Sequence, residues 1–132
     1  MKERRKTVIP INLKSSVPIW EQIKEQMKKQ ILMGVWESGE QLPSVRSLAT
    51  ELGINPNTIQ RAYSELEREG LTYTVVGKGC FVEEDLTKVQ EKKEKEAFEK
   101  LSALLDELKD MKVCKEKILS VIEESYKEGN HD

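Results

Sequence analysis

The sequence predicts a mainly α-helical fold with one small β-hairpin. Three observations support this fold class. Apolar residues recur at helical spacing along most of the chain, which is typical of amphipathic helices. Two closely spaced helix boundaries fall within residues 41–63, and a β-rich segment with a glycine-rich turn follows at residues 71–82. With 132 residues, the chain has the length of one ordinary domain, or of a small domain with an appendage.

Residues 1–14 are predicted to form an N-terminal arm. The arm begins with a basic cluster, which comprises Lys2, Arg4, Arg5 and Lys6. Two interpretations stay open: a solvated tail, as at most chain ends, or an arm that follows phosphate groups. The apolar residues that come next can form a short strand or a packed extension; they are Val8, Ile9, Ile11 and Leu13.

The first convincing helix begins near Pro18 and ends at Gly34, with Ser15 or Ser16 near its N-cap. Its apolar positions recur every four residues, and we expect them to support the helices that follow: Ile19 or Trp20, Ile23, Met27 and Ile31. Three cations lie mainly off this stripe, namely Lys24, Lys28 and Lys29. In the turn after the helix, Trp36 is predicted to plug the core.

Residues 41–63 predict two short helices joined by a tight turn. Ser44 can cap the first helix, because a hydroxyl just before a helix accepts a hydrogen bond from an unpaired backbone N–H. Gly53 can end that helix in the left-handed conformation, Asn55 can cap the second helix, and Pro56 suits its first turn. Apolar stripes run along both helices: Val45, Leu48, Ala49 and Leu52, then Ile59, Ala62, Tyr63 and Leu66.

The polar residues of the second helix point away from its stripe; they are Asn57, Thr58, Gln60 and Arg61. Two helices with a glycine in the turn are typical of a helix-turn-helix, whose second helix enters the major groove of DNA. Arg pairs with guanine edges, and Asn and Gln pair with adenine. Asn57 and Arg61 are four residues apart and share a face. The alternative is an ordinary polar surface on a small helical domain.

A β-hairpin is predicted directly after this helix. Residues 71–76 are rich in β-branched and aromatic side chains, and residues 80–82 form a second short strand. Gly77, Lys78 and Gly79 form the turn between them. A hairpin at this position is the wing of a winged helix-turn-helix. Its glycines allow the backbone to approach a sugar-phosphate chain, and Lys78 can bind phosphate or enter the minor groove. The winged helix-turn-helix domain is thus predicted to span residues 15–82.

Residues 83–132 are predicted to form a C-terminal helical dimerisation region with two helices. An acidic start at residues 83–85 suits a helix N-terminus, and residues 111–114 interrupt the helical pattern. The apolar residues expected to mediate dimerisation are Phe98, Leu101, Leu104, Leu105, Leu108, Ile118, Leu119 and Ile122. Two helices cannot bury so much apolar surface on each other alone, so we expect a symmetric homodimer. The alternative is that they fold back on the winged domain of one chain.

The charge distribution agrees with this division. The whole chain has a net charge of −2. Residues 1–82 contain 12 Lys and Arg against 9 Asp and Glu, a net charge of +3, and residues 83–132 contain 10 against 15, a net charge of −5. The basic N-terminal part can approach nucleic-acid phosphates, and the acidic C-terminal part would avoid them.

The chain resembles the N-terminal domain of GntR-family bacterial transcription regulators over about residues 10–82. The resemblance rests on five segments in the right order and spacing: 18–23, 42–49, 53–58, 61–71 and 77–82. The short C-terminal region resembles the YtrA-like branch, which lacks a larger effector domain and often represses transporter genes. Trp20 and Cys80 depart from the family pattern, where Tyr and Thr or Ser are usual.

The resemblance implies roles for individual residues. It implies DNA contacts at the start of the first short helix, along the second, and in the wing, at Ser44, Arg46, Asn55, Asn57, Thr58, Gln60, Arg61, Gly77 and Lys78. Together with the wing's Gly79, these are the predicted DNA-binding residues. The predicted protein is therefore a homodimeric, cytoplasmic, sequence-specific regulator, most simply a repressor on an inverted-repeat operator. The alternative function is a winged-helix scaffold for protein interactions.

Other function classes are not expected. The sequence shows no nucleophile–histidine pair and no paired carboxylates in a recognisable loop, so we do not predict an enzyme or a cofactor. Cys80 and Cys114 lack the spacing of a zinc site, and His131 is near the terminus. No run of about 18 apolar residues predicts a membrane span, and no signal peptide is expected. Two signals that could release the protein from DNA stay open: an apolar effector that binds at the helical dimer interface, and oxidation of the two cysteines.

Overall fold

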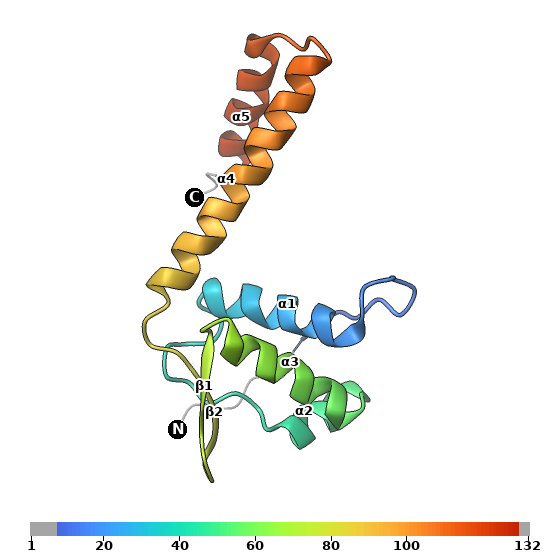
Figure 1. Cartoon of the computed structure of the whole chain (residues 1–132), viewed down its shortest axis with the longest axis vertical. Helices are drawn as coiled ribbons and strands as arrows, with labels where there is room; N and C mark the ends of the chain where they lie inside the picture. The colour runs from blue at the N-terminus through green and yellow to red at the C-terminus, as the bar shows by residue number, and fades with distance from the viewer. Residues whose placement is uncertain (1–7, 130–132) are drawn as a thin grey trace. The chain divides into compact units, whose positions relative to one another are not determined.

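The computed structural model describes residues 8–129 and confirms the predicted fold class, mainly helical with one hairpin (Figure 1). The basic cluster of the arm and His131 lie outside the described residues. The elements in chain order are α1 (Ile19–Leu32), α2 (Val45–Leu52), α3 (Pro56–Arg68), β1 (Thr72–Val75), β2 (Gly79–Val82), α4 (Thr87–Asp110) and α5 (Lys115–Gly129). The chain divides into two compact units, with the boundary between Glu91 and Lys92. The predicted domain limits at residues 14 and 82 stay a prediction.

The core of the first unit lies where α1, α2 and α3 meet, with α1 and α2 both packed against α3. Most of its fully buried side chains come from the helical stripes predicted above: Ile23, Met27, Leu48, Ile59 and Leu66. The other two are Leu71, just before β1, and Val82, at the end of β2. Trp36 is buried as predicted, and its indole N–H donates to Gln30 Oε1 at 2.9 Å. Burial of these apolar surfaces stabilises the unit and holds α3 with its opposite side exposed.

The N-terminal segment packs against the same core without forming a strand. Ile9 is buried and Ile11 is half-buried, while the Gln30 side chain donates to the Val8 carbonyl oxygen. The predicted start of α1 near Pro18 is confirmed, but neither Ser15 nor Ser16, the residues expected near the N-cap, caps the helix. Pro18 itself is the N-cap residue and no side chain caps the helix; the Ser15 hydroxyl instead accepts a hydrogen bond from the Val17 N–H.

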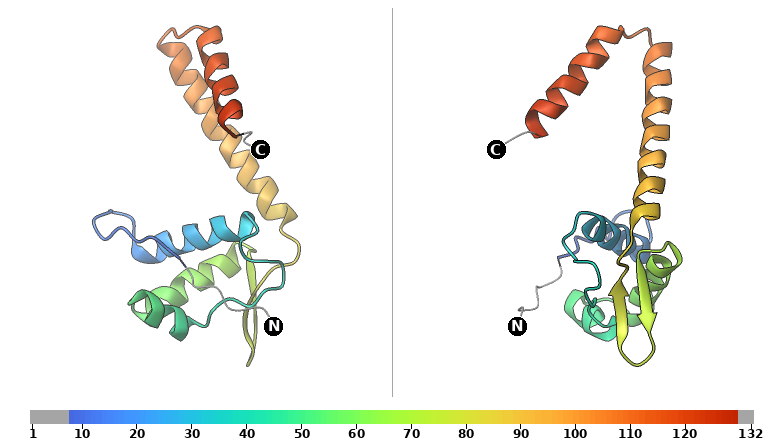
Figure 2. Two further views of the ribbon diagram at one scale, coloured as in Figure 1. Left: turned by 180° about the vertical axis from the view of Figure 1, so that it is seen from behind. Right: turned by 90° about the vertical axis from the view of Figure 1, so that its left-hand side faces the viewer.

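The hairpin is antiparallel, and its two faces differ. Facing residues are Thr72 with Val82, Tyr73 with Phe81, Thr74 with Cys80, and Val75 with Gly79. Thr72 and Val82 are buried against the core. Tyr73 and Phe81 stack on the opposite face with ring centres 5.7 Å apart. Since one face is held by the core, the register of the hairpin is well determined, and its tip extends beyond the helices of this unit (Figure 2).

In the second unit, the break at residues 111–114 is confirmed, and α5 diverges from α4 after it (Figure 2). Lys112 adopts a left-handed φ of 62° in this break. One boundary differs from the prediction. The helix α4 begins at Thr87, after the acidic residues, of which only Asp85 accepts a hydrogen bond from the Thr87 N–H. The helix α5 continues to Gly129.

Candidate nucleic-acid interface

The geometry of the α2–α3 pair follows from local sequence signals. The Ser44 hydroxyl accepts the Ser47 N–H at 3.0 Å, and the Asn55 side chain accepts the Asn57 N–H at 2.8 Å. Gly53 ends α2 with a φ of 68°, the left-handed conformation that glycine adopts without a steric penalty. Both caps and the turn therefore form as predicted, and they place α3 directly after α2.

A buried hydrogen bond joins the two helices. The Tyr63 hydroxyl, on the core side of α3, donates to the Pro43 carbonyl oxygen at 2.7 Å. Pro43 immediately precedes the N-cap of α2. The bond therefore holds the start of α2 against α3, and the exposed side chains of Ser44 and Arg46 remain at the surface beside it.

The polar edge of α3 is brought together as predicted. Asn57, Gln60 and Arg61 are exposed, while Thr58 is half-buried. The Gln60 amide donates to the Ser64 hydroxyl at 3.2 Å, one turn further along the helix. Arg61 points to the other side of this edge, where its guanidinium carbon lies 4.2 Å from the ring centre of Trp20 in α1. The edge therefore presents amide and guanidinium donors, the groups that pair with base edges.

The wing loop lies one residue earlier than predicted. Its residues are Val76, Gly77 and Lys78, whereas Gly79 already pairs with Val75 as the first residue of β2. The turn is closed by the Lys78 N–H, which donates to the Val75 carbonyl oxygen at 2.9 Å. Gly77 has a φ of 80°, so a glycine suits this turn. The Lys78 side chain is exposed at the tip of the hairpin, next to Val76, which is 96% exposed.

A contact that the sequence did not suggest anchors the wing. The Gln41 side chain donates to the Lys78 carbonyl oxygen at 2.8 Å, and the Leu42 N–H donates to the Cys80 carbonyl oxygen at 2.9 Å. The segment before α2 thereby runs beside β2, with Gln41 opposite Phe81. Because Gln41 lies three residues before Ser44, the wing and the start of α2 are held by the same short segment.

A groove of about 450 Å³ lies between the wing, α3 and the start of α2. Its polar lining includes Ser44, Gln60, Ser64 and Lys78. Within the described residues, the side chains of Arg46 and Lys78 form no ion pair, so both cations are available to an anionic partner. The groove therefore combines hydroxyl, amide and ammonium donors, which suit phosphate oxygens, with one carboxylate, that of Glu67, which accepts a hydrogen bond from the Thr74 hydroxyl.

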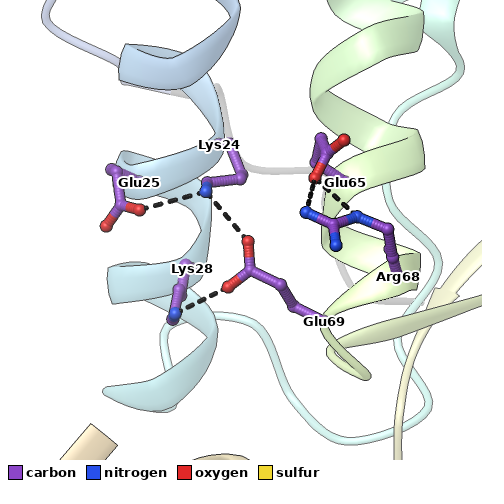
Figure 3. Close-up of polar contacts among 6 residues, drawn as sticks. All are labelled: Lys24, Glu25, Lys28, Glu65, Arg68 and Glu69. Carbon is purple, nitrogen blue, oxygen red and sulfur yellow. Dashed lines mark hydrogen bonds and ion pairs between the residues drawn. The ribbon is translucent and has the colours of Figure 1, made fainter. Parts of the chain in front are cut away.

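Two of the three lysines of α1 have a different role. Lys24 and Lys28 bind the two carboxylate oxygens of Glu69, at the end of α3, at 2.9 and 2.7 Å (Figure 3). Burial alone would raise the pKa of Glu69, but the hydrogen bonds from Lys28 and Lys24 outweigh it and lower that pKa. These lysines therefore join α1 to α3 and are not part of the exposed edge.

The described residues contain no group of three His, Cys, Asp or Glu that could hold a metal ion. Cys80 is half-buried on β2 and Cys114 is exposed in the break after α4. Burial raises the pKa of the Cys80 thiol. No helix among residues 8–129 has the length and hydropathy needed to span a membrane.

The residues predicted to mediate dimerisation lie in the second unit, on α4 and α5. Five of them are exposed: Phe98, Leu101, Leu104, Leu119 and Ile122. Leu105, Leu108 and Ile118 are half-buried. An apolar groove of about 350 Å³ lies between the two helices, lined among others by Leu105, Ile118 and Ile122. Both helices of this unit therefore expose large apolar side chains.

A hairpin wing beside a helix-turn-helix, with a polar exposed edge on α3, defines a DNA-binding transcription regulator of the winged helix type. Residues 19–82 match the family described as "Bacterial regulatory proteins, gntR family". The chain belongs to this family, and it is a transcription regulator and not an enzyme.

Two curated relatives come from Bacillus subtilis (strain 168). The HTH-type transcriptional repressor YtrA is 50% identical over 78 residues, which cover 59% of this chain and 60% of YtrA. The uncharacterized HTH-type transcriptional regulator YhcF is 39% identical over 115 residues, which cover 87% of this chain and 94% of YhcF.

Solved structures give the same result over most of the chain. A GntR family transcriptional regulator from Listeria monocytogenes has a TM-score of 0.71 and 37% identity, and covers 85% of this chain and 98% of its own. A transcriptional regulator from Oenococcus oeni has a TM-score of 0.75 and 29% identity, with coverages of 88% and 97%. Both matches extend beyond the winged domain.

Proposed function

We propose that this protein is a homodimeric, cytoplasmic repressor that binds an inverted-repeat operator, and that α3 reads the bases. The observation that carries the proposal is the exposed edge of α3, on which Asn57, Gln60 and Arg61 are all exposed and of which Gln60 lines the groove that leads to the wing. These side chains have the donors and acceptors that distinguish base pairs in the major groove. Thr58 and Asn55 complete the same edge, at the N-terminus of the helix.

Two flanking elements would bind the phosphates. Arg46 lies in the first turn of α2 with Ser44 as its N-cap, where backbone N–H groups and the helix dipole favour an anion. On the other flank, Lys78 at the wing tip is exposed and forms no ion pair within residues 8–127, and Gly77 beside it has no atom within 4 Å of the position of a Cβ, so the backbone there is open. Contacts on both sides would set the position of α3 in the groove, since phosphate contacts orient a protein on the duplex.

Homodimerisation would use the exposed apolar face of α4 and α5. A face with Phe98, Leu101 and Leu104 each at least 44% exposed favours association, because burial of apolar surface is worth about 25 cal/mol per Å². A symmetric pair would present two copies of α3, as helix-turn-helix dimers do when they read two half-sites about one DNA turn apart. Repression is proposed because the relative YtrA is named a repressor. Transporter genes are proposed as targets only from the resemblance of the C-terminal region to the YtrA-like branch.

Genome-wide mapping of bound sites, followed by binding of the purified protein to the enriched duplex, tests the proposal. We expect an inverted repeat among the enriched sites, a complex of two chains per duplex, and an affinity that falls steeply with salt concentration. Deletion of the gene should raise transcription of the adjacent genes. Equal affinity for the enriched duplex and for a random duplex, together with a stable complex with another protein, would favour the interaction scaffold instead.

A further inference from the structure

The Trp20–Arg61 contact joins two helices at the edge of the DNA-reading surface. Trp20 lies in the first turn of α1, is half-buried and packs against the core of the first unit. Arg61 lies in the middle of α3 and is exposed. The guanidinium carbon is 4.2 Å from the ring centre, a distance at which an arginine and an aromatic face attract each other.

Whether the N–H groups of Arg61 remain free to bind DNA depends on whether its partner is a carboxylate or an aromatic ring. Arg68, on the same helix, donates from both Nε and Nη2 to one carboxylate oxygen of Glu65, so these donors are occupied. Arg61 has no acidic partner among residues 8–127, and its contact is with a ring face. A ring attracts the flat side of a guanidinium and leaves its in-plane N–H groups free for other acceptors.

Trp20 is also well placed to hold the guanidinium still. Its ring is anchored in the core, and Lys24, the other cation near it at 5.9 Å, is bound by Glu69. An arginine side chain loses considerable rotamer freedom when it binds, and a side chain that is already held loses less. The ring can therefore reduce the entropic cost of each hydrogen bond that Arg61 makes.

We infer that Trp20 is a positioning residue for DNA recognition: its ring holds the Arg61 guanidinium at the edge of α3 with the N–H donors directed to the duplex. The inference rests on the proposed function, because it assigns a role within the same DNA-reading surface. It adds a residue of α1, distant in sequence from the helix-turn-helix, to the determinants of affinity.

A double-mutant cycle with the operator duplex tests the inference. We expect Trp20→Leu to weaken operator binding about three- to ten-fold, in the range of a cation–aromatic contact. In an Arg61→Ala background the same change should have less than about a two-fold effect, because the partner is gone. Trp20→Tyr keeps an aromatic face and should retain most of the affinity. Leu32→Ala, another half-buried α1 side chain that packs on the core, controls for loss of stability alone.

The pair can also be observed without DNA. The chain has two tryptophans, so a spectrum of ¹⁵N-labelled indole groups should show two signals, and Trp20→Tyr identifies that of Trp20. We expect Arg61→Ala to shift the Trp20 signal and to leave that of Trp36 in place. Equal losses of affinity for Trp20→Leu in both backgrounds, with the wild type still specific for the operator, would overturn this inference alone. A wild type without operator preference would overturn the proposed function and this role with it.

Discussion

Gln41 and Gly79 lie in direct contact, so that a side chain at position 79 would meet the Gln41 amide. The Gln41 Nε2 is 2.8 Å from the point where a Cβ of residue 79 would be, and Gly79 has a φ of 123°. The Gln41 amide can move aside only if it gives up its hydrogen bond to the Lys78 carbonyl oxygen. The wing therefore depends on a glycine at the start of β2 for two separate reasons, the left-handed φ and the contact with Gln41.

Gly79→Ala is accordingly expected to lower the free energy of unfolding by about 1–3 kcal/mol, the usual cost of a strained backbone. Urea unfolding measures the change. Gly77→Ala is the matched control: its φ of 80° is also left-handed, but no atom lies within 4 Å of the added Cβ, so its loss should be smaller. If both variants lowered the free energy of unfolding equally, the contact between Gln41 and residue 79 would not contribute to the loss.

Glu69 should make stability depend on pH. Its pKa is lowered from the usual 4.5, since the hydrogen bonds from Lys28 and Lys24 outweigh the effect of burial. A carboxylate with a lower pKa in the folded chain stabilises the fold above its unfolded pKa, and that stabilisation is lost as the pH falls through the folded pKa. Glu69→Gln should therefore cost about 1 kcal/mol at pH 7 and progressively less as the pH falls below 4.5, by urea unfolding.

The Glu65–Arg68 pair supplies the comparison for that measurement, because the Arg68 side chain is 73% exposed (Figure 3). Solvent screens exposed pairs, and Glu65→Gln should change stability little at pH 7. If the loss caused by Glu69→Gln stayed the same from pH 7 down to the lowest pH at which the wild type is folded, the negative charge of Glu69 would not be the source of the stabilisation.

Lys78→Ala should weaken DNA binding by a similar factor for all sequences and should reduce the slope of log affinity against log salt by about one, as loss of a single phosphate contact does. Arg61→Ala should act differently, with a loss of about 1–3 kcal/mol for the operator and a relaxed base preference. Binding titrations at several salt concentrations, on operator and random duplexes, separate the two. A sequence-selective loss with Lys78→Ala would indicate base reading by the wing.

Leu104→Glu should dissociate the proposed homodimer. Leu104 is 56% exposed on α4, within the predicted dimerisation face, and a charge placed in an apolar interface is costly. Sedimentation equilibrium should give twice the chain mass for the wild type and a mass near one chain for the variant. Met33→Glu introduces the same charge at a 68% exposed apolar residue outside that face, and it should keep the wild-type mass. A wild type that is monomeric at all concentrations would contradict the proposed assembly.

The two thiols should differ in reactivity. Burial raises the pKa of Cys80 and so lowers its thiolate fraction, whereas Cys114 is exposed. Since the thiolate is the reactive form, an alkylating reagent at pH 8 should modify Cys114 first and Cys80 much more slowly. Mass spectrometry of timed samples, with Cys114→Ser as control, measures both rates. Rapid modification of Cys80 in the folded protein would instead support oxidation of this wing residue as a release signal.

Much of the site could be predicted because its signals are local. The Ser44 and Asn55 caps, the left-handed Gly53 and the glycine-containing hairpin turn each involve residues within a few positions of one another. Helical spacing alone placed the buried stripes of α2 and α3, and so also left the polar edge of α3 facing outward. The start of α4 and the cap of α1 differ from the prediction at places where several nearby residues could serve as the cap.

The sequence by itself determined the class of this protein: the order of the helices, the turn, the wing, and the polar residues offered for recognition. Only the tertiary structure decided how those residues are held. Lys28 meets Glu69 across 41 positions, Gln41 meets Lys78 across 37, and Trp20 meets Arg61 between α1 and α3. Such contacts form between side chains that packing brings together from separate elements. No spacing rule along the chain specifies them, because helical and strand periods describe only the residues of one element.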